Sequence, residues 1–175
     1  MLKGCLYIPA FIADGNLLFD YLKDQIVWRE DIKARKTASF GIPYDYSNTF
    51  YLETTIPSIF VDLFTDFKKN VGFTPNNVLL NYYYNGNSKM GFHSDNIEIL
   101  ESNTGIVIIS LGSERILRFK KKISKEYFDI VLENGSLFYM NQAIQKKYLH
   151  SILIANEESN ERISITFRKI KTGLK

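Results

Sequence analysis

Cysteine and histidine are scarce in this sequence, and proline and glycine form no clusters. The 175 residues include one cysteine, Cys5, so no disulfide can form within the chain and no zinc site of several cysteines is possible. A reducing compartment is therefore expected. The 4 prolines and 10 glycines form no Pro/Gly-rich linker. Only two histidines, His93 and His150, are available as metal ligands.

Long apolar runs are missing as well. No stretch approaches the roughly 18 apolar residues that a membrane helix needs. Residues 1–14 lack the charged region and long apolar run of a signal peptide. We therefore expect no membrane association and a cytoplasmic or nuclear location. The net charge of +3 suits a polyanionic partner and an ordinary solvated surface equally well.

The chain is predicted to be a single domain, residues 1–175, that begins with a mixed section of helices and short strands. Asp14 is placed to cap a helix, and Pro57 to open another whose apolar residues follow helical spacing. The elements expected in residues 1–75 are an edge strand at residues 5–9, a helix at 15–25, a charged loop leading into a strand at 29–41, and a helix from 57 to about 70.

Residues 76–170 contain short apolar runs separated by turn residues such as Asn85-Gly86. Runs of Val, Ile, Leu, Tyr and Phe at this spacing predict the strands of a sandwich or jelly roll. The predicted strands are Val78–Tyr84, Gly105–Leu111, Arg115–Phe119, Phe128–Leu132, Ser136–Met140, His150–Ala155 and Arg162–Arg168. Helices first and strands later give an α+β fold with a jelly-roll (double-stranded β-helix) core.

The segment His93-Ser94-Asp95 is a candidate metal motif. Alternate residues of an extended segment share a face, so His93 and Asp95 would project to the same side. With His150 on a later strand they would supply two imidazoles and one carboxylate, the facial set of non-haem iron(II) oxygenases. On its own, His-x-Asp is a weak signal, and surface or core histidines that bind no metal are the more common explanation.

Two arginines bracket the last predicted strand. Alternation puts Arg162, Ser164, Thr166 and Arg168 on one face of it. Interior arginines need an anionic partner, because burying an unpaired guanidinium is unfavourable. Since arginine suits bidentate carboxylate binding, a dicarboxylate would satisfy both. The alternative is an exposed edge strand whose arginines face solvent.

These motifs belong to a longer pattern that resembles the AlkB family of Fe(II)- and 2-oxoglutarate-dependent oxygenases. The resemblance covers roughly residues 35–170, and the motifs follow the family order. It rests on Asn81-Tyr82-Tyr83, Gly91 to Asp95, Ile109 to Gly112, Asn134 to Leu137, Met140, Gln145, His150-Ser151 and Arg162 to Arg168.

The resemblance implies an Fe(II) centre whose catalytic ligands would be His93, Asp95 and His150. Arg162 would pair with the distal carboxylate of 2-oxoglutarate, and Arg168 would lie near its other end. Further cosubstrate contacts would come from Asn81, Tyr83 and, where many relatives carry Asn, Ser164. With O2 as the other cosubstrate, the family reaction oxidises N-alkyl groups on bases and releases formaldehyde, succinate and CO2.

The N-terminal section resembles the nucleotide-recognition lid of the same family. Tyr46 would stack on a flipped base, while Arg35 and Tyr44 would contact the nucleotide. Ordinary strand packing is the alternative for both tyrosines. Residues 29–33 are charged and lack the hydrophobic finger of relatives that attack duplex DNA. This favours single-stranded DNA or RNA with alkylated bases as the partner.

Several alternatives stay open at this point. The same oxygenase fold can act on a protein or a small molecule, and a relative can bind nucleic acid without catalysis. A cupin-type jelly roll is a third alternative, although cupins usually use more histidines. Ile97 stands where some relatives carry an acidic residue, which leaves the base preference open. Lysines at 120–122 and 125 suit phosphates or a solvated hairpin. A monomer is assumed.

Overall fold

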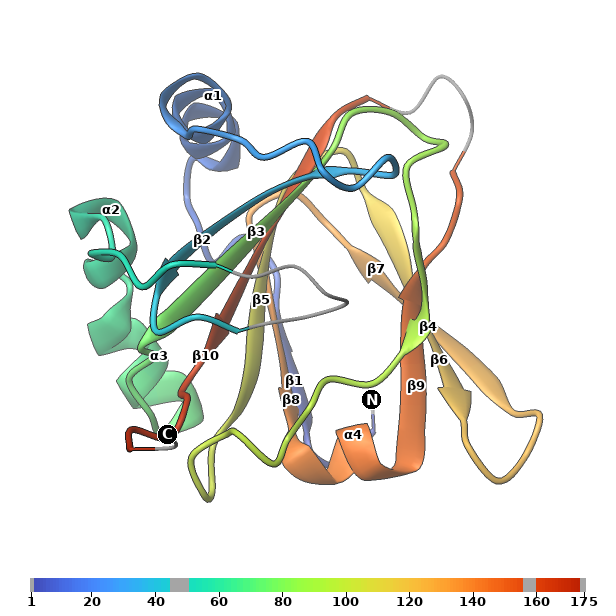
Figure 1. The fold of residues 1–175 in the computed structure, drawn as a ribbon. Helices are drawn as coiled ribbons and strands as arrows, with labels where there is room; N and C mark the ends of the chain where they lie inside the picture. The colour runs from blue at the N-terminus through green and yellow to red at the C-terminus, as the bar shows by residue number, and fades with distance from the viewer. Residues whose placement is uncertain (1, 45–50, 156–159, 174–175) are drawn as a thin grey trace.

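Two antiparallel sheets form the centre of the protein (Figure 1). The computed structural model describes residues 2–44, 51–155 and 160–173. The larger sheet has six strands in the order β1 (Cys5–Ile8), β8 (Ser136–Asn141), β5 (Gly105–Gly112), β10 (Arg162–Arg168), β3 (Asn77–Tyr83) and β2 (Lys36–Gly41). The smaller sheet has four, in the order β4 (Met90–His93), β9 (Tyr148–Ile152), β6 (Arg115–Lys121) and β7 (Tyr127–Leu132). The predicted jelly-roll core is confirmed.

Three helices, α1 (Gly15–Gln25), α2 (Ser58–Val61) and α3 (Phe64–Val71), lie beside the larger sheet (Figure 1). The predicted start of α1 is confirmed, because the Asp14 carboxylate accepts a hydrogen bond of 3.0 Å from the Leu17 backbone nitrogen. Leu22, Phe60 and Phe67 pack on the sheet residues that face the helices. Among the described residues, no helix is long and apolar enough to cross a membrane.

A second apolar core lies between the two sheets. Alternate residues of one strand serve different cores: on β3, Val78 and Leu80 belong to the helix side, and Leu79 and Tyr83 to the side of the smaller sheet. β10 follows the same rule, with Ile163, Ile165 and Phe167 in the helix-side core. Its four polar residues therefore face the space between the sheets.

Three elements differ from the sequence-based prediction. The single helix predicted from residue 57 to about 70 is wrong, because the chain makes a tight turn at Asp62 and Leu63 that separates α2 from α3. The short strand β4 and the helix α4 (Gln142–Lys147) were not expected. α4 has six residues, too few for an apolar repeat, and the side chain of Asn141 caps it by accepting from the Ile144 backbone nitrogen.

Candidate metal centre and its cavity

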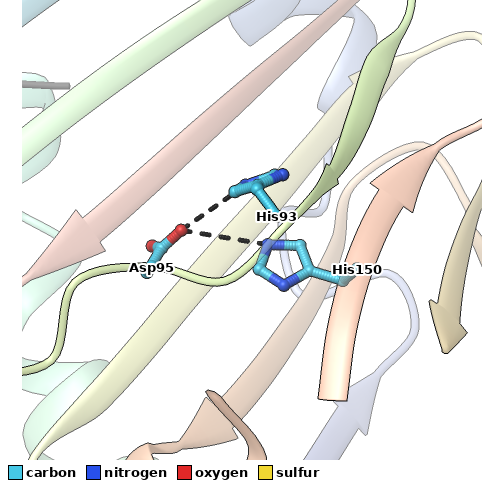
Figure 2. Close-up of side chains that lie close together, drawn as sticks. All are labelled: His93, Asp95 and His150. Atoms are coloured by element: carbon cyan, nitrogen blue, oxygen red, sulfur yellow. Dashed lines mark ion pairs between the residues drawn. The ribbon is translucent and has the colours of Figure 1, made fainter. Parts of the chain in front are cut away.

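Three potential metal ligands meet between the sheets. His93 ends β4, Asp95 follows it, and His150 pairs with His93 from β9. One ligand atom of each residue lies within 4.8 Å of the other two. The Nε2 atoms of His93 and His150 are 3.5 Å and 3.9 Å from Oδ1 of Asp95 (Figure 2). Two imidazole nitrogens and one carboxylate oxygen in this arrangement match the donor set of a non-haem iron(II) site.

A β-bulge lets β4 present His93 to the cavity. Met90 pairs with Ile152 and His93 with His150, so β4 has an extra residue over this interval. Residues three apart on a regular strand would face opposite sides, yet Met90 and His93 both line the cavity. Nδ1 of His93 lies 2.9 Å from the Gly91 carbonyl oxygen. A tautomer that donates there directs the Nε2 lone pair toward the cavity.

Asp95 is held in place through both its carboxylate and its backbone nitrogen. Its Oδ2 accepts hydrogen bonds from Nε and Nη2 of Arg168, at 2.9 Å and 2.5 Å, which leaves Oδ1 on the histidine side. Its backbone nitrogen donates to Oε1 of Gln145 at 2.8 Å. Burial opposes the charged carboxylate, but the charge of Arg168 and the contact with His93 hold the pKa of Asp95 well below its usual range. Asp95 therefore offers an ionised, oriented carboxylate to a metal.

His150 is buried in the neutral form that a metal requires. Burial, with a smaller effect from His93, lowers the pKa of His150 to about 3. Phe119 of β6 contributes to this apolar environment, with its ring centroid 5.9 Å from that of His150. At neutral pH the imidazole therefore needs no deprotonation before it binds a divalent metal.

Arg162 supplies an unsatisfied positive charge in the wall of the same cavity. It is fully buried, and its Nε donates to the Ser110 hydroxyl oxygen at 2.9 Å. Among the described residues, no hydrogen-bond partner faces Nη1 or Nη2. Burial lowers the pKa of Arg162 to about 10, so the side chain stays cationic at neutral pH. Two buried, unpartnered donors fit a carboxylate that binds in a bidentate manner.

The other residues predicted to bind 2-oxoglutarate line the same cavity, and one of them already has a partner. Asn81, Tyr83 and Ser164 all contribute to the wall. Oδ1 of Asn81 accepts a hydrogen bond of 2.7 Å from Nε of Arg35. The ring centroid of Tyr83 lies 5.2 Å from Cζ of Arg162. The structure thus brings the predicted cosubstrate residues together around one space.

The predicted nucleotide contacts lie in different surroundings. Arg35 is in the cavity wall and also borders a surface hollow beside His93. Tyr44 is almost fully buried: its ring centroid is 4.0 Å from Cζ of Arg168, and its hydroxyl accepts from the Asn96 backbone nitrogen at 2.8 Å. These contacts stabilise the segment that carries Asp95. Tyr46 lies outside the described residues.

Two supporting residues received no role from sequence reasoning. Gln145 is presented by the unexpected helix α4. Arg115 is almost fully buried on β6 and donates from Nη2 to the carbonyl oxygens of Ser88 and Leu153, both at 2.5 Å. These carbonyls lie between β3 and β4 and just after β9, so Arg115 ties together strand ends that border the site. Alternation on β6 puts Arg115 on the same face as the buried Leu117 and Phe119, but its charge gives no sign of burial.

Comparison with known proteins agrees with this geometry. A family model described as the 2OG-Fe(II) oxygenase superfamily matches residues 23–168. The chain belongs to this superfamily. Its members use Fe(II), 2-oxoglutarate and O2, and His93, Asp95 and His150 form the group that can hold the metal.

Similar proteins place the chain in the AlkB family of that superfamily. Human AlkB homolog 3 is 28% identical over 190 residues, which cover 96% of this chain and 66% of that protein. An uncharacterised protein of Acanthamoeba polyphaga mimivirus is 33% identical over 150 residues, or 82% of this chain and 77% of the relative. The bovine protein named DNA oxidative demethylase ALKBH2 is 28% identical over 151 residues, covering 78% of this chain and 53% of that protein.

A solved structure supports the fold independently. The structure of OsALKBH1 superposes with a TM-score of 0.74 and covers 97% of this chain and 99% of the other, at 16% sequence identity. At that identity the likeness concerns the fold alone. The chain spans about two thirds of the length of AlkB homolog 3, at 66% for the human protein.

Proposed function

We propose that this protein is an Fe(II)- and 2-oxoglutarate-dependent dioxygenase that oxidatively demethylates N-alkylated bases in single-stranded DNA or RNA. One observation carries the proposal: the three potential metal ligands and the unpartnered Nη1 and Nη2 of Arg162 face the same cavity. A cosubstrate that joins a metal-chelating end to a carboxylate fits this pair of features.

Each side chain of the cavity has a distinct part in the proposed reaction. The metal would be bound by His93 Nε2, Asp95 Oδ1 and His150 Nε2, while Arg168 and Gln145 keep Asp95 in place. Arg162 binds the distal carboxylate of 2-oxoglutarate. When bound, the iron and its cosubstrates supply the oxidising power for the N-alkyl group. The protein orients the reactants.

Most of the remaining cavity wall is apolar. Side chains from β3, β5, β6 and β9 exclude bulk water from the metal centre; they are Leu79, Ile106, Ile108, Leu117 and Ile152. Exclusion of water strengthens the pairing between Arg162 and a carboxylate and limits side reactions of the oxidant.

The nucleic-acid part of the proposal rests on relatives and on the rim of the cavity. Relatives bear the names AlkB homolog 3 and DNA oxidative demethylase ALKBH2. Arg35 and Lys33 border the hollow beside His93, where an anionic backbone can approach. Residues 29–33 carry no apolar wedge, which favours single strands over duplexes. Base stacking on Tyr46 belongs to the same proposal.

Activity measurements test the proposal directly. The protein is reconstituted anaerobically with Fe(II) and 2-oxoglutarate, then given O2 and single-stranded oligonucleotides that carry N-methyl adducts. Mass spectrometry should detect loss of the methyl mass together with succinate. Succinate with unchanged oligonucleotides would retain the oxygenase and contradict this substrate class. No succinate from metal-loaded protein would contradict the oxygenase itself.

A further inference from the structure

A group of aromatic and cationic side chains lies exposed on the smaller sheet. Phe92 of β4 and Tyr127 of β7 are 42% and 50% exposed, and their ring centroids are 6.1 Å apart. Nζ of Lys120 lies about equally far from both rings, 5.9 Å and 5.8 Å from the two centroids. Cζ of Arg118 is 6.0 Å from the Tyr127 ring. We call Phe92, Arg118, Lys120 and Tyr127 the outer-sheet cluster.

The cluster lies on the reverse side of the strands that carry the metal ligands. On β6, Phe119 is fully buried and contacts the ring of His150, so its neighbours Arg118 and Lys120 point to the other face of the sheet. Phe92 immediately precedes His93, which lines the cavity. The outer-sheet cluster is therefore built on the same strands as the site but is open to solvent.

The charge of the hairpin that carries this face favours an anion. The hairpin of β6 and β7 carries Arg118 and four lysines at positions 120, 121, 122 and 125, against two acids, Glu126 and Asp129. Both acids form ion pairs within the hairpin: Glu126 with Lys121 at 3.0 Å, and Asp129 with Arg118 at 2.6 Å. Within the described part of the chain, Lys120 has no carboxylate in ion-pair range, so its charge is available to a ligand.

The cluster continues to the hollow beside the metal centre. Phe92 borders that hollow together with Lys33, Arg35 and His93. Positive charge and exposed rings thus extend from the rim of the cavity across β4 to β7. A strand whose reacting base enters the cavity would have its neighbouring nucleotides over this surface.

We propose that the outer-sheet cluster binds the single-stranded nucleic acid that flanks the reacting base, with unpaired bases stacked on Phe92 and on Tyr127 and a phosphate near Lys120. This rests on the function proposed above. Exposed aromatic side chains stack on bases of any sequence, and lysines add a salt-dependent contact with the backbone. Single strands fit better than duplexes, because only an unpaired base offers its face to an exposed ring.

Binding of an unmodified oligonucleotide tests this surface without turnover. A labelled single-stranded 15-mer is titrated by fluorescence anisotropy at several salt concentrations against the wild type, Tyr127→Ala and Lys120→Ala. Loss of stacking in Tyr127→Ala should raise Kd about 5-fold or more, with the salt dependence unchanged. Lys120→Ala should lower the slope of log Kd against log salt by about 0.7, and Lys120→Arg should restore it.

Matched substitutions elsewhere control for general effects. Tyr21 on α1 is 48% exposed, close to Tyr127, and Lys69 is an exposed lysine of α3. Tyr21→Ala and Lys69→Ala should leave both Kd and its salt slope at the wild-type values. All variants are compared by thermal melting. Equal Kd values for Tyr127→Ala and Tyr21→Ala would overturn the proposal, as would the same losses on a blunt duplex.

The outcome is separable from that of the proposed function. If the wild type demethylates and Tyr127→Ala and Lys120→Ala bind with the Kd of the control variants, the proposed role of the outer-sheet cluster alone is refuted. If the wild type does not demethylate but the variants lose affinity as expected, the demethylase function is refuted. The outer-sheet cluster is then still supported as a nucleic-acid site.

Discussion

Replacing Arg162 with Met should weaken 2-oxoglutarate binding and leave the fold intact. The substitution keeps an apolar stem but removes Nη1 and Nη2, two buried guanidinium nitrogens in the cavity wall that lack hydrogen-bond partners among the described residues. A buried carboxylate that loses its cation is destabilised by about 3–5 kcal/mol. The expected rise in Kd is therefore about 150- to 5000-fold.

The same substitution should have the opposite effect on the ligand-free protein. Arg162 is fully buried, and burial disfavours its charge strongly enough to lower its pKa to about 10. Replacing such a cation with an apolar side chain of similar length is commonly neutral or stabilising. The free energy of unfolding without 2-oxoglutarate should therefore be unchanged or higher in Arg162→Met.

Calorimetric titration of 2-oxoglutarate into protein loaded with Mn(II) measures the affinity, and urea unfolding measures the stability. Arg118→Met is the control, because Arg118 is partly exposed and pairs with Asp129 away from the cavity. Wild-type affinity in Arg162→Met would refute the assigned carboxylate contact. Loss of both affinity and stability would show instead that Arg162 serves the fold.

Three further predictions follow from other contacts. Gln145→Leu removes the acceptor of the Asp95 backbone nitrogen and should weaken metal affinity about 10- to 100-fold in a metal titration; wild-type affinity would contradict this. Arg115→Met leaves backbone carbonyls without donors and should lower the free energy of unfolding by about 1–3 kcal/mol in urea. Arg118→Met should lower the free energy of unfolding by less than about 1 kcal/mol. Equal losses in the two variants would refute the stabilising role of the hydrogen bonds that Arg115 makes. Burial raises the pKa of Cys5 from 9.0 to about 11, so its contribution to stability is complete below pH 9 and is lost as the pH rises toward 11. The rate at which iodoacetamide alkylates Cys5 in the folded protein should rise with pH, with a midpoint near pH 11. A midpoint near pH 9 would contradict this prediction.

Periodic features of the sequence predicted much of the fold. The period of two in residues 162–168 predicts which side chains face the cavity, and the structure has Ile163, Ile165 and Phe167 in the opposite core. The start of α1 follows from a side-chain cap three residues before Leu17, a contact within one turn. Both signals depend on interactions between near neighbours in the chain, so no knowledge of the fold is needed to read them.

Contacts between distant residues could not be obtained in this way. Asp95 and Arg168 are 73 residues apart, and their ion pair depends on the arrangement of the two sheets. The bulge that turns His93 inward is a property of the pairing between β4 and β9. Arginine is usually found at the surface, but Arg115 is buried against backbone carbonyls. In each case tertiary structure decides the role.

We expect one cavity to hold a metal at His93, Asp95 and His150 and a dicarboxylate at Arg162. Anaerobic titration of 2-oxoglutarate into Fe(II)-loaded protein tests it most directly, because a visible charge-transfer absorption arises when the keto acid chelates the iron. The wild type should saturate at one 2-oxoglutarate per chain, Arg162→Met should reach the same amplitude only at far higher concentration, and His93→Ala should give no band. A wild-type protein without the band, or a His93→Ala variant with an unchanged band and midpoint, would contradict the account.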